Sequence, residues 1–243
     1  MNAPRFAVVI PVYNHQGSIL QVIRKTLLLG IPVFVVNDGS TDGTREEIQN
    51  VNGITVLTHS VNRGKGAALL TGFAAAATAG ADYAVTIDAD GQHDPTNAHR
   101  LMEAAEPGKC VMVVGRRQAM DVPSIPWTSR FGRKFSNFWV WASGGPPLSD
   151  TQSGYRLYPL PETLRLKARA RRFAFEVEIL VLAKRQNIPI LQVPVSVDYE
   201  PGGKRISHFR PFVDFWRNAF VFTRLIVSRP LFFISRRLKG SDV

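Results

Sequence analysis

The first 115 residues alternate short apolar runs with longer helix-like segments, and this alternation restricts the possible fold more than any other feature. Apolar runs bounded by Gly, Asn and Asp predict strands, and the segments between them have helical spacing. We expect strands at 6–12, 33–36, 54–58, 83–87 and 110–114, and helices at 18–29, 44–50, 65–79 and 96–105. Such alternation predicts an α/β fold, a mostly parallel sheet with helices on both faces.

Polar segments stand where four of these strands end. They are Pro11 to Asn14, Asn37 to Gly43, Asn62 to Gly66 and Asp88 to His93. Open α/β sheets bind ligands at the carboxyl ends of their strands, so the four segments predict one site at one sheet edge. The segment that contains Asp38 could instead be only a turn and helix cap. The glycines around Lys65 let backbone approach a phosphate, although their spacing is neither that of a P-loop nor that of a Rossmann fingerprint.

Two carboxylates, Asp88 and Asp90, stand one residue apart after an apolar run. On an extended backbone they project to the same side, so together they can hold one hard divalent cation, Mg²⁺ or Mn²⁺, whose other positions are filled by water or a substrate phosphate. The alternative is an Asp-rich turn that caps the helix beginning at Pro95. His93 could be a further metal ligand or could orient an aspartate.

The charge of the chain is concentrated in its second half. Of 243 residues, 30 are Lys or Arg and 19 are Asp or Glu, and residues 113–243 hold 22 of the basic and 9 of the acidic residues. Such a basic surface indicates an anionic partner, which could be nucleic acid, phospholipid or a phosphorylated substrate. In the segment 127–139, Arg130 and Arg133 share a helix face among aromatic residues. This segment suits a membrane surface or a core-packing helix.

Six segments together resemble the motifs of a known family. In chain order they are Ile10–Asn14, Val36–Asp42, Asn62–Gly66, Asp88–His93, Asp150–Arg156 and Glu176–Leu180. Over about residues 5 to 200 the chain resembles the family 2 glycosyltransferases of the GT-A fold, and most of all the dolichyl-phosphate mannosyltransferases and their bacterial polyprenyl-phosphate relatives. The resemblance implies a metal-dependent, inverting transfer of a sugar from a UDP- or GDP-linked donor to an anionic lipid acceptor, which we expect to be polyprenyl phosphate.

The resemblance also implies roles for particular residues. The catalytic candidates are Asp90, Asp150 and Arg156; the metal ligands are Asp88, Asp90 and His93; the donor-binding candidates are Pro11, Tyr13, Asn14, Asp38, Lys65, Asp88, Ala89, Gln92 and Arg117. For the acceptor or the membrane they are Arg130, Arg133, Ser153, Lys204 and His208. Arg117 and Arg156 are proposed for phosphate contacts because a guanidinium matches phosphate oxygens bidentately. The alternative is that Arg116 or Arg117 is a surface partner for the acidic first half of the chain.

The sequence does not contain the motif that supplies a general base in many members of this family. Transfer to a sugar hydroxyl needs a carboxylate to take the proton, and many family members carry an acidic pair ahead of a tryptophan near Asp150. Here the stretch reads Leu-Ser-Asp-Thr-Gln over residues 148–152. Either Asp150 alone is the base, in a transfer to another lipid or glycan hydroxyl, or the acceptor is already an anion. The aromatic and basic second half favours the anionic lipid.

We expect a GT-A domain over residues 1–205 and a basic, aromatic, amphipathic helical tail over 206–243. Residues 203–243 carry nine Lys or Arg against two Asp or Glu, and Arg224, Arg229 and Pro230 interrupt every apolar stretch before it reaches the ~18 residues that a spanning helix requires. The tail therefore predicts peripheral binding at the cytoplasmic face of the cell membrane. The alternative is a helix packed on the domain or on a second subunit of a homo-oligomer.

The other classes of protein considered explain less of the pattern. A nucleic-acid-binding protein would account for the charge, but no reading module is present, so we expect no nucleic-acid partner. A sugar-phosphate nucleotidyltransferase should open with a Gly-rich loop and an arginine where this chain has Pro11 to Asn14. A non-catalytic membrane scaffold would need the carboxylates to be inert. The N-terminus has too short an apolar run for a signal peptide, and one cysteine permits no internal disulfide, both of which predict a cytoplasmic protein.

Overall fold

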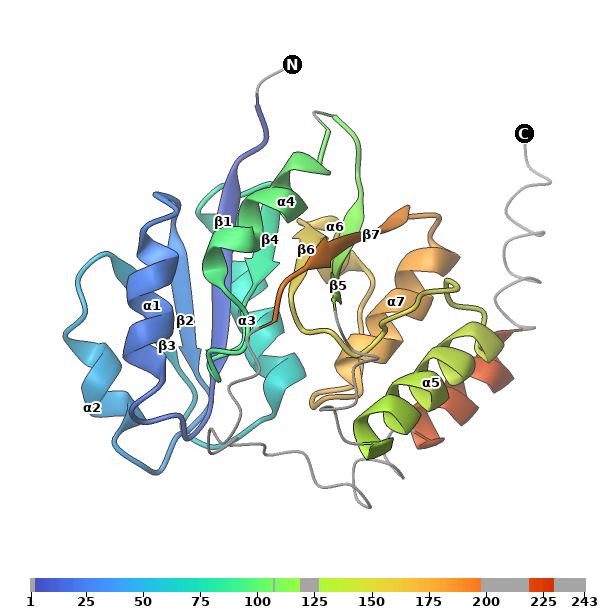
Figure 1. Ribbon diagram of the computed structural model, residues 1–243, viewed down its shortest axis with the longest axis horizontal. Coiled ribbons are helices and arrows are strands. Elements are labelled where there is room, and N and C mark those ends of the chain that lie inside the picture. The colour runs from blue at the N-terminus through green and yellow to red at the C-terminus, as the bar shows by residue number, and fades with distance from the viewer. Residues whose placement is uncertain (1–2, 107, 119–126, 198–218, 230–243) are drawn as a thin grey trace.

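The computed structural model describes residues 3–106, 108–118, 127–197 and 219–229, and a seven-stranded sheet forms its centre (Figure 1). The sheet order is β3-β2-β1-β4-β6-β5-β7. The strands are β1 (Phe6–Val12), β2 (Val33–Asn37), β3 (Ile54–Thr58), β4 (Tyr83–Thr86), β5 (Met112–Arg117), β6 (Arg156–Pro159) and β7 (Ile190–Val195). All neighbouring pairs are parallel except those that include β6. The predicted α/β class with a mostly parallel sheet is confirmed.

Helices cover both faces of this sheet, as expected from the alternation (Figure 1). They are α1 (Ile19–Leu27), α2 (Thr44–Gln49), α3 (Lys65–Thr78), the 3₁₀ turn η1 (Pro95–Asn97), α4 (Ala98–Glu103), α5 (Trp127–Ala142), α6 (Glu162–Arg165) and α7 (Phe175–Arg185). Residues 219–229 are also helical. One difference from the expected bounds is that β5 begins at Met112, because Gly108 adopts a positive φ and the Lys109 carbonyl accepts the Tyr83 hydroxyl in a turn.

Strand β1 shows how one run of apolar residues supplies two cores. Ala7 and Val9 face the core under α3 and α7, whereas Val8, Ile10 and Val12 face the core under α1, α2 and α4. Successive side chains of a strand point to opposite faces, so a strand covered on both faces must be apolar throughout. Every residue of β1 after Phe6 is buried accordingly.

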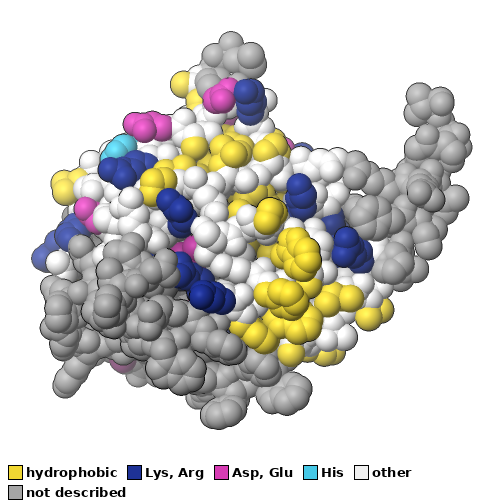
Figure 2. All heavy atoms as spheres, turned by 45° about the vertical axis from the view of Figure 1, so that its right-hand side comes forward, with side chains coloured by type: hydrophobic (Ala, Val, Ile, Leu, Met, Phe, Trp, Pro, Cys, Tyr) yellow, Lys and Arg dark blue, Asp and Glu magenta, His cyan; other side chains and the backbone are white. Residues whose placement is uncertain are grey.

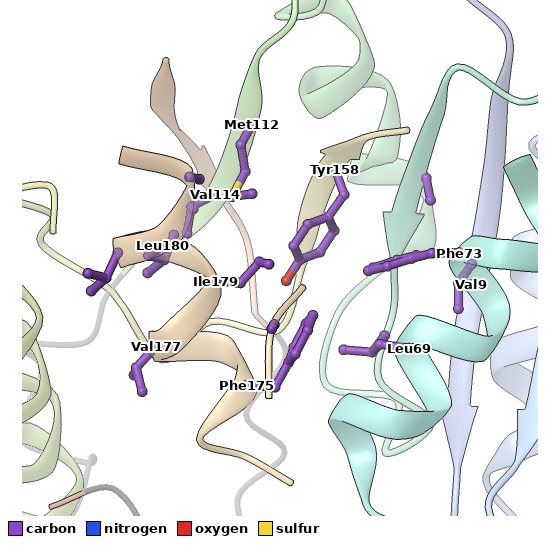
Figure 3. Packing of buried hydrophobic residues seen from close by; sticks show 14 of the residues in the cluster. Val9, Leu69, Phe73, Met112, Val114, Tyr158, Phe175, Val177, Ile179 and Leu180 are labelled. Atoms are coloured by element: carbon purple, nitrogen blue, oxygen red, sulfur yellow. The ribbon is translucent and has the colours of Figure 1, made fainter. Parts of the chain in front are cut away.

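The antiparallel strand β6 is the part of the sheet that the alternation does not predict. It lies between β4 and β5, and its register places Arg156 opposite Thr86 at the carboxyl end of β4. The preceding loop, residues 150–155, is thereby brought to the edge where β1, β2 and β4 end. The last of the six sequence segments joins the same edge because α7 begins there and packs through Phe175 and Ile179 against Phe73 and Tyr158 (Figure 3).

The C-terminal helix, residues 219–229, packs on this domain. Val221, Phe222 and Leu225 are at most 6% exposed and belong to the core shared with α5 and α7. Trp139 of α5 stacks on Phe222, with 6.1 Å between ring centroids. For these residues the structure corresponds to the packed-helix alternative, and the remainder of the predicted tail lies outside the described residues. None of the helices in the described ranges has the length and apolarity needed to span a membrane.

A close approach between α3 and the sheet yields a stability prediction. A Cβ at Gly72 would lie 2.4 Å from Val9 Cγ1, whereas a Cβ at Gly132 of α5 would meet no atom within 4 Å. Gly72→Ala should therefore lower the free energy of unfolding by about 1–3 kcal/mol through overpacking. Gly132→Ala should raise it by about 0.5–1 kcal/mol, since alanine favours the helix. Denaturant unfolding measures both, and equal effects of the two changes would contradict the packing argument.

Candidate active site

The loops after β1 and β2 are held together by side chains of the predicted donor-binding segments. Asn14 has a positive φ of 52°. Its side-chain oxygen accepts the backbone amide of Thr41 at 2.8 Å, and its backbone amide donates to the Ser40 hydroxyl at 3.1 Å. The Ser40 amide donates in turn to the Asn37 side chain at 3.0 Å. Asn14 thus fixes the shape of this edge of the site.

Asp38 ends a strand as predicted, but its carboxylate is turned into the protein. It is 2% exposed, and it accepts the backbone amides of Arg63 at 2.9 Å and Gly64 at 2.7 Å. His59 Nδ1 lies 2.7 Å from the same carboxylate, and His59 Nε2 lies 3.0 Å from the Thr71 hydroxyl. Asp38 therefore shapes the glycine loop before Lys65 by capping its free amides. The donor-binding role of Asp38 stays a prediction.

The ammonium group of Lys65 lies between two carboxylates at the centre of the site. Its Nζ is 2.6 Å from Asp88 Oδ1 and 2.6 Å from Glu176 Oε1, and the three side chains are 14%, 26% and 9% exposed. Burial by itself would lower the pKa of Lys65, but the charges of Asp88 and Glu176 raise it. Lys65 is consequently a fixed cation beside the first aspartate of the Asp-Ala-Asp sequence.

The two aspartates of this sequence have opposite pKa shifts. For Asp88, burial acts to raise the pKa but the nearby Lys65 lowers it. Burial and the Asp88 charge raise the pKa of Asp90, whose Oδ1 accepts the Gln92 amide at 3.1 Å. A carboxylate that is destabilised by burial and by a negative neighbour is stabilised by a cation placed between the two. These opposite shifts are compatible with the predicted divalent metal ion at the pair, and that role stays a prediction.

His93 does not complete a set of three metal ligands. Within the described ranges no three His, Cys, Asp or Glu side chains come together as a metal site. The His93 ring is 5% exposed and packs against Tyr155 with 4.9 Å between centroids. Burial lowers the pKa of His93 to about 4, so the ring is neutral at pH 7. His93 Nδ1 is buried without a hydrogen-bond partner among the described residues, so both roles that the sequence left open for His93 stay predictions.

Arg117 and Asp150 form a bidentate ion pair at the next strand end. Arg117 Nε donates to Asp150 Oδ2 at 2.8 Å and its Nη2 to Oδ1 at 2.9 Å, while its backbone amide also reaches Oδ2 at 3.2 Å. Asp150 is 0% exposed. Although burial acts to raise its pKa, the hydrogen bonds and charge of Arg117 lower it, and Arg133 adds to this effect. Both oxygens of the predicted base are therefore occupied by one guanidinium.

Arg156 is placed differently from the sequence prediction. Its guanidinium is 0% exposed and donates to the backbone carbonyls of Thr151, Ser153 and Glu176 at 2.9, 2.7 and 2.7 Å. A phosphate cannot reach a group with no exposed surface, so the structure does not support the predicted phosphate contact. Arg156 instead ties the loop before β6 to the first turn of α7. Ser153, predicted near the acceptor, is itself 1% exposed.

The remaining predicted residues divide by position. Pro11 is buried within β1 opposite Val36, and Ala89 is buried, with its carbonyl accepting the Ser18 hydroxyl at 3.0 Å. Tyr13 and Gln92 are half-buried at the site edge. Arg133 of α5 is 8% exposed and lies near Asp150. The side chain of Arg130, and Lys204 and His208 altogether, lie outside the described residues.

Comparison with known proteins assigns the chain to a family. The model described as Glycosyl transferase family 2 matches residues 7–175, which is more than half of the sequence. The chain belongs to glycosyltransferase family 2. The sequence resemblance is thereby confirmed, and the protein is an enzyme of the glycosyltransferase class.

Curated relatives of this family 2 glycosyltransferase are named for lipid phosphates. The UDP-N-acetylglucosamine–dolichyl-phosphate N-acetylglucosaminyltransferase of Methanococcus voltae is 30% identical over 212 residues, which cover 79% of this chain and 84% of the relative. The undecaprenyl-phosphate mannosyltransferase of Micrococcus luteus is 29% identical, with 84% and 88% covered.

A solved structure confirms the GT-A type of fold. Glucosyl-3-phosphoglycerate synthase from Mycobacterium tuberculosis, crystallised with Mg²⁺ and UDP, aligns with a TM-score of 0.64 at 21% identity. The alignment covers 93% of this chain and 79% of that protein.

The carboxylate set of this family 2 enzyme fits the metal that the family implies. Mg²⁺ is commonly bound through one or two carboxylates together with substrate phosphates, and it does not need a cage made only of protein ligands. Asp88 and Asp90 provide such a pair, and the raised pKa of Asp90 marks a place where added positive charge is stabilising. Asp88 and Asp90 are therefore the residues that would hold the ion.

Three residues of the site were missed by the sequence predictions. His59 supports Asp38, Glu176 pairs with Lys65, and Gly154 lies under the ion pairs. Glu176 opens the sixth sequence segment and Gly154 lies in the fifth, so the motifs contained both. The sequence analysis did not predict the antiparallel strand β6, and it is this strand that brings the two segments close to Lys65.

Gly154 leads to a prediction about this enzyme. A Cβ at this position would lie 2.5 Å from Asp88 Oδ2, 2.6 Å from Lys65 Nζ and 3.0 Å from Glu176 Oε1. Gly154→Ala should leave the melting temperature within a few degrees, because flexible side-chain ends can move, but should weaken nucleotide and Mn²⁺ binding by about tenfold or more. Calorimetric titration measures the binding. Unchanged affinities would show that this ion-pair cluster lies outside the ligand site.

Proposed function

We propose that this family 2 enzyme transfers a sugar with inversion from a nucleoside diphosphate sugar to polyprenyl phosphate at the cytoplasmic face of the membrane. The observation that carries the proposal is the charged cluster of Lys65, Asp88 and Asp90 at the carboxyl edge of the sheet. Edges of this kind bind nucleotides in open α/β folds. The curated relatives act, by name, on dolichyl or undecaprenyl phosphate, which supports the choice of acceptor.

In this proposal Asp88 and Asp90 are the residues that would hold Mg²⁺ or Mn²⁺ for the donor diphosphate. The ion, when bound, supplies positive charge where the leaving diphosphate gains negative charge. Lys65 faces the same region as a permanent cation, since its pKa is raised. A preorganised cation needs no reorganisation as the bond between the anomeric carbon and the diphosphate oxygen breaks, and this arrangement stabilises the transition state.

The Arg117–Asp150 pair supports an acceptor that is already ionised. A carboxylate with a lowered pKa and both oxygens bonded to a guanidinium is a poor proton acceptor. A phosphate oxygen attacks the anomeric carbon without losing a proton, so no base is required. Arg117 and Arg133, which both act on Asp150, provide the positive surroundings that an anionic headgroup needs.

The alternative keeps Asp150 as a base for a hydroxyl acceptor. Asp150 could accept a proton only if Arg117 moved away from its carboxylate when the acceptor binds. Separating this buried ion pair is energetically costly. The ion pair as observed therefore favours the phosphate acceptor. The two proposals differ in the acceptor and share the same donor site.

Membrane contact is proposed for the face that carries α5. Phe138 and Trp141 are 54% and 58% exposed, and Phe220 of the C-terminal helix is 70% exposed. Figure 2 shows apolar side chains gathered on this side of the molecule, with basic side chains nearby. Lys134 of α5 and Arg229 of the C-terminal helix are exposed basic residues on the same two helices. Exposed aromatics beside basic groups suit the interface of an anionic leaflet.

The donor site is tested by ligand-dependent melting. UDP or GDP, whichever the enzyme uses, should raise the melting temperature of the full chain by several degrees when Mn²⁺ is present, because a ligand at about a hundred times its Kd adds about 2.7 kcal/mol to stability. Asp90→Asn should abolish the Mn²⁺-dependent part of the shift. No shift with either nucleotide would refute the donor proposal, and an unchanged shift in the variant would refute the metal-binding role of Asp90.

The membrane face is tested by flotation with vesicles of anionic phospholipid. The double change Phe138→Ser and Trp141→Ser should lower the bound fraction by about fivefold or more, since each aromatic ring contributes apolar burial at the interface. Leu28→Ser is the matched control, because Leu28 is 80% exposed at the end of α1, outside this face. Equal flotation of the double variant and the wild type would rule the proposed face out.

A further inference from the structure

Glu176 is a buried acid that contacts the proposed donor and metal site through Lys65. It stands in the first turn of α7, is 7% exposed, and lies 2.6 Å from Lys65 Nζ through Oε1. A buried carboxylate is strongly destabilising unless it is compensated. Lys65 provides that compensation, and the positive end of the α7 dipole adds to it.

The position of Glu176 is fixed by the surrounding chain. Its backbone carbonyl accepts Arg156 Nη1 at 2.7 Å, so the buried guanidinium of Arg156 anchors the start of α7 to β6. Gly154 leaves the space in which Lys65, Asp88 and Glu176 meet. The carboxylate is therefore held at Lys65 by the fold itself.

The charges of this cluster have a defined sum. Counted as formal charges, the carboxylates of Asp88, Asp90 and Glu176 contribute three negative charges and the ammonium of Lys65 one positive charge. The remaining charge of two matches one divalent cation. Without Glu176, the ammonium group of Lys65 would pair with Asp88 alone. It would then compete with a metal ion for the Asp88 carboxylate.

We propose that Glu176 is a positioning residue that shares the Lys65 ammonium with Asp88, so that Asp88 can bind the metal while Lys65 stays beside the donor diphosphate. This inference rests on the proposed function, because it assumes that the cluster binds a metal and a nucleotide. It predicts effects of opposite sign on the two ligands. Removing the Glu176 charge weakens cation binding and strengthens metal-free anion binding.

The experiment uses the full chain with Glu176→Gln. Mn²⁺ affinity without nucleotide should fall about tenfold, and the affinity for UDP or GDP in EDTA should rise about twofold or more. Calorimetry measures the nucleotide, and the electron paramagnetic resonance of free Mn²⁺ measures the metal. A merely structural role would lower both affinities together or change neither, and either result overturns the inference.

Two further variants separate the explanations. Glu178→Gln alters the neighbouring buried acid of α7, which accepts the amides of Arg169 at 2.9 Å and Ala170 at 2.6 Å and pairs with Arg224. It should lower the melting temperature and leave both affinities within about twofold. Glu176→Asp keeps the charge and should retain Mn²⁺ affinity within about threefold, so a full loss there would overturn the charge argument. If the wild type binds neither ligand, the proposed function itself fails.

Discussion

The ammonium group of Lys65 is the point on which the site depends, because it joins three elements that are distant in the sequence. Lys65 begins α3, Asp88 follows β4, and Glu176 lies in the first turn of α7. In a partly buried setting such charges interact more strongly than in water, but each is costly if it loses its partners. The cluster therefore fixes the relative positions of these elements and holds charge where a diphosphate and a metal are proposed to bind.

Around this cluster, several of the polar residues serve the shape of the site. Asp38 caps the loop before Lys65 with help from His59, and Asn14 fastens the loop after β1 to the loop after β2. Arg156 secures the start of α7 through backbone carbonyls. Rigid support of this kind keeps reactive groups near their working geometry. These polar side chains therefore make hydrogen bonds within the protein and hold the loops of the site in place.

The second centre of charge, Arg117 with Asp150, bears on the acceptor. Its buried carboxylate is neutralised by a bidentate guanidinium, and Arg133 lies close by. Because Asp150 is paired in this way, we propose a nucleophile that carries its own negative charge. The exposed aromatics of α5 lie on the same helix as Arg133, and this is the side proposed for the approach of the lipid-borne phosphate.

The sequence by itself determined the α/β class, the parallel strands β1 to β4, the family and the acidic pair, because apolar periodicity and short motifs are local properties of the chain. Only the tertiary structure decided that β6 runs antiparallel, that Arg156 is buried among carbonyls, that Asp150 is paired and that Glu176 reaches Lys65. The sequence likewise predicts that residues 219–229 are amphipathic, but only the structure shows that their apolar face packs on α5 and α7. These outcomes depend on which distant segments meet, and that is set by strand order and by the need to compensate buried charge.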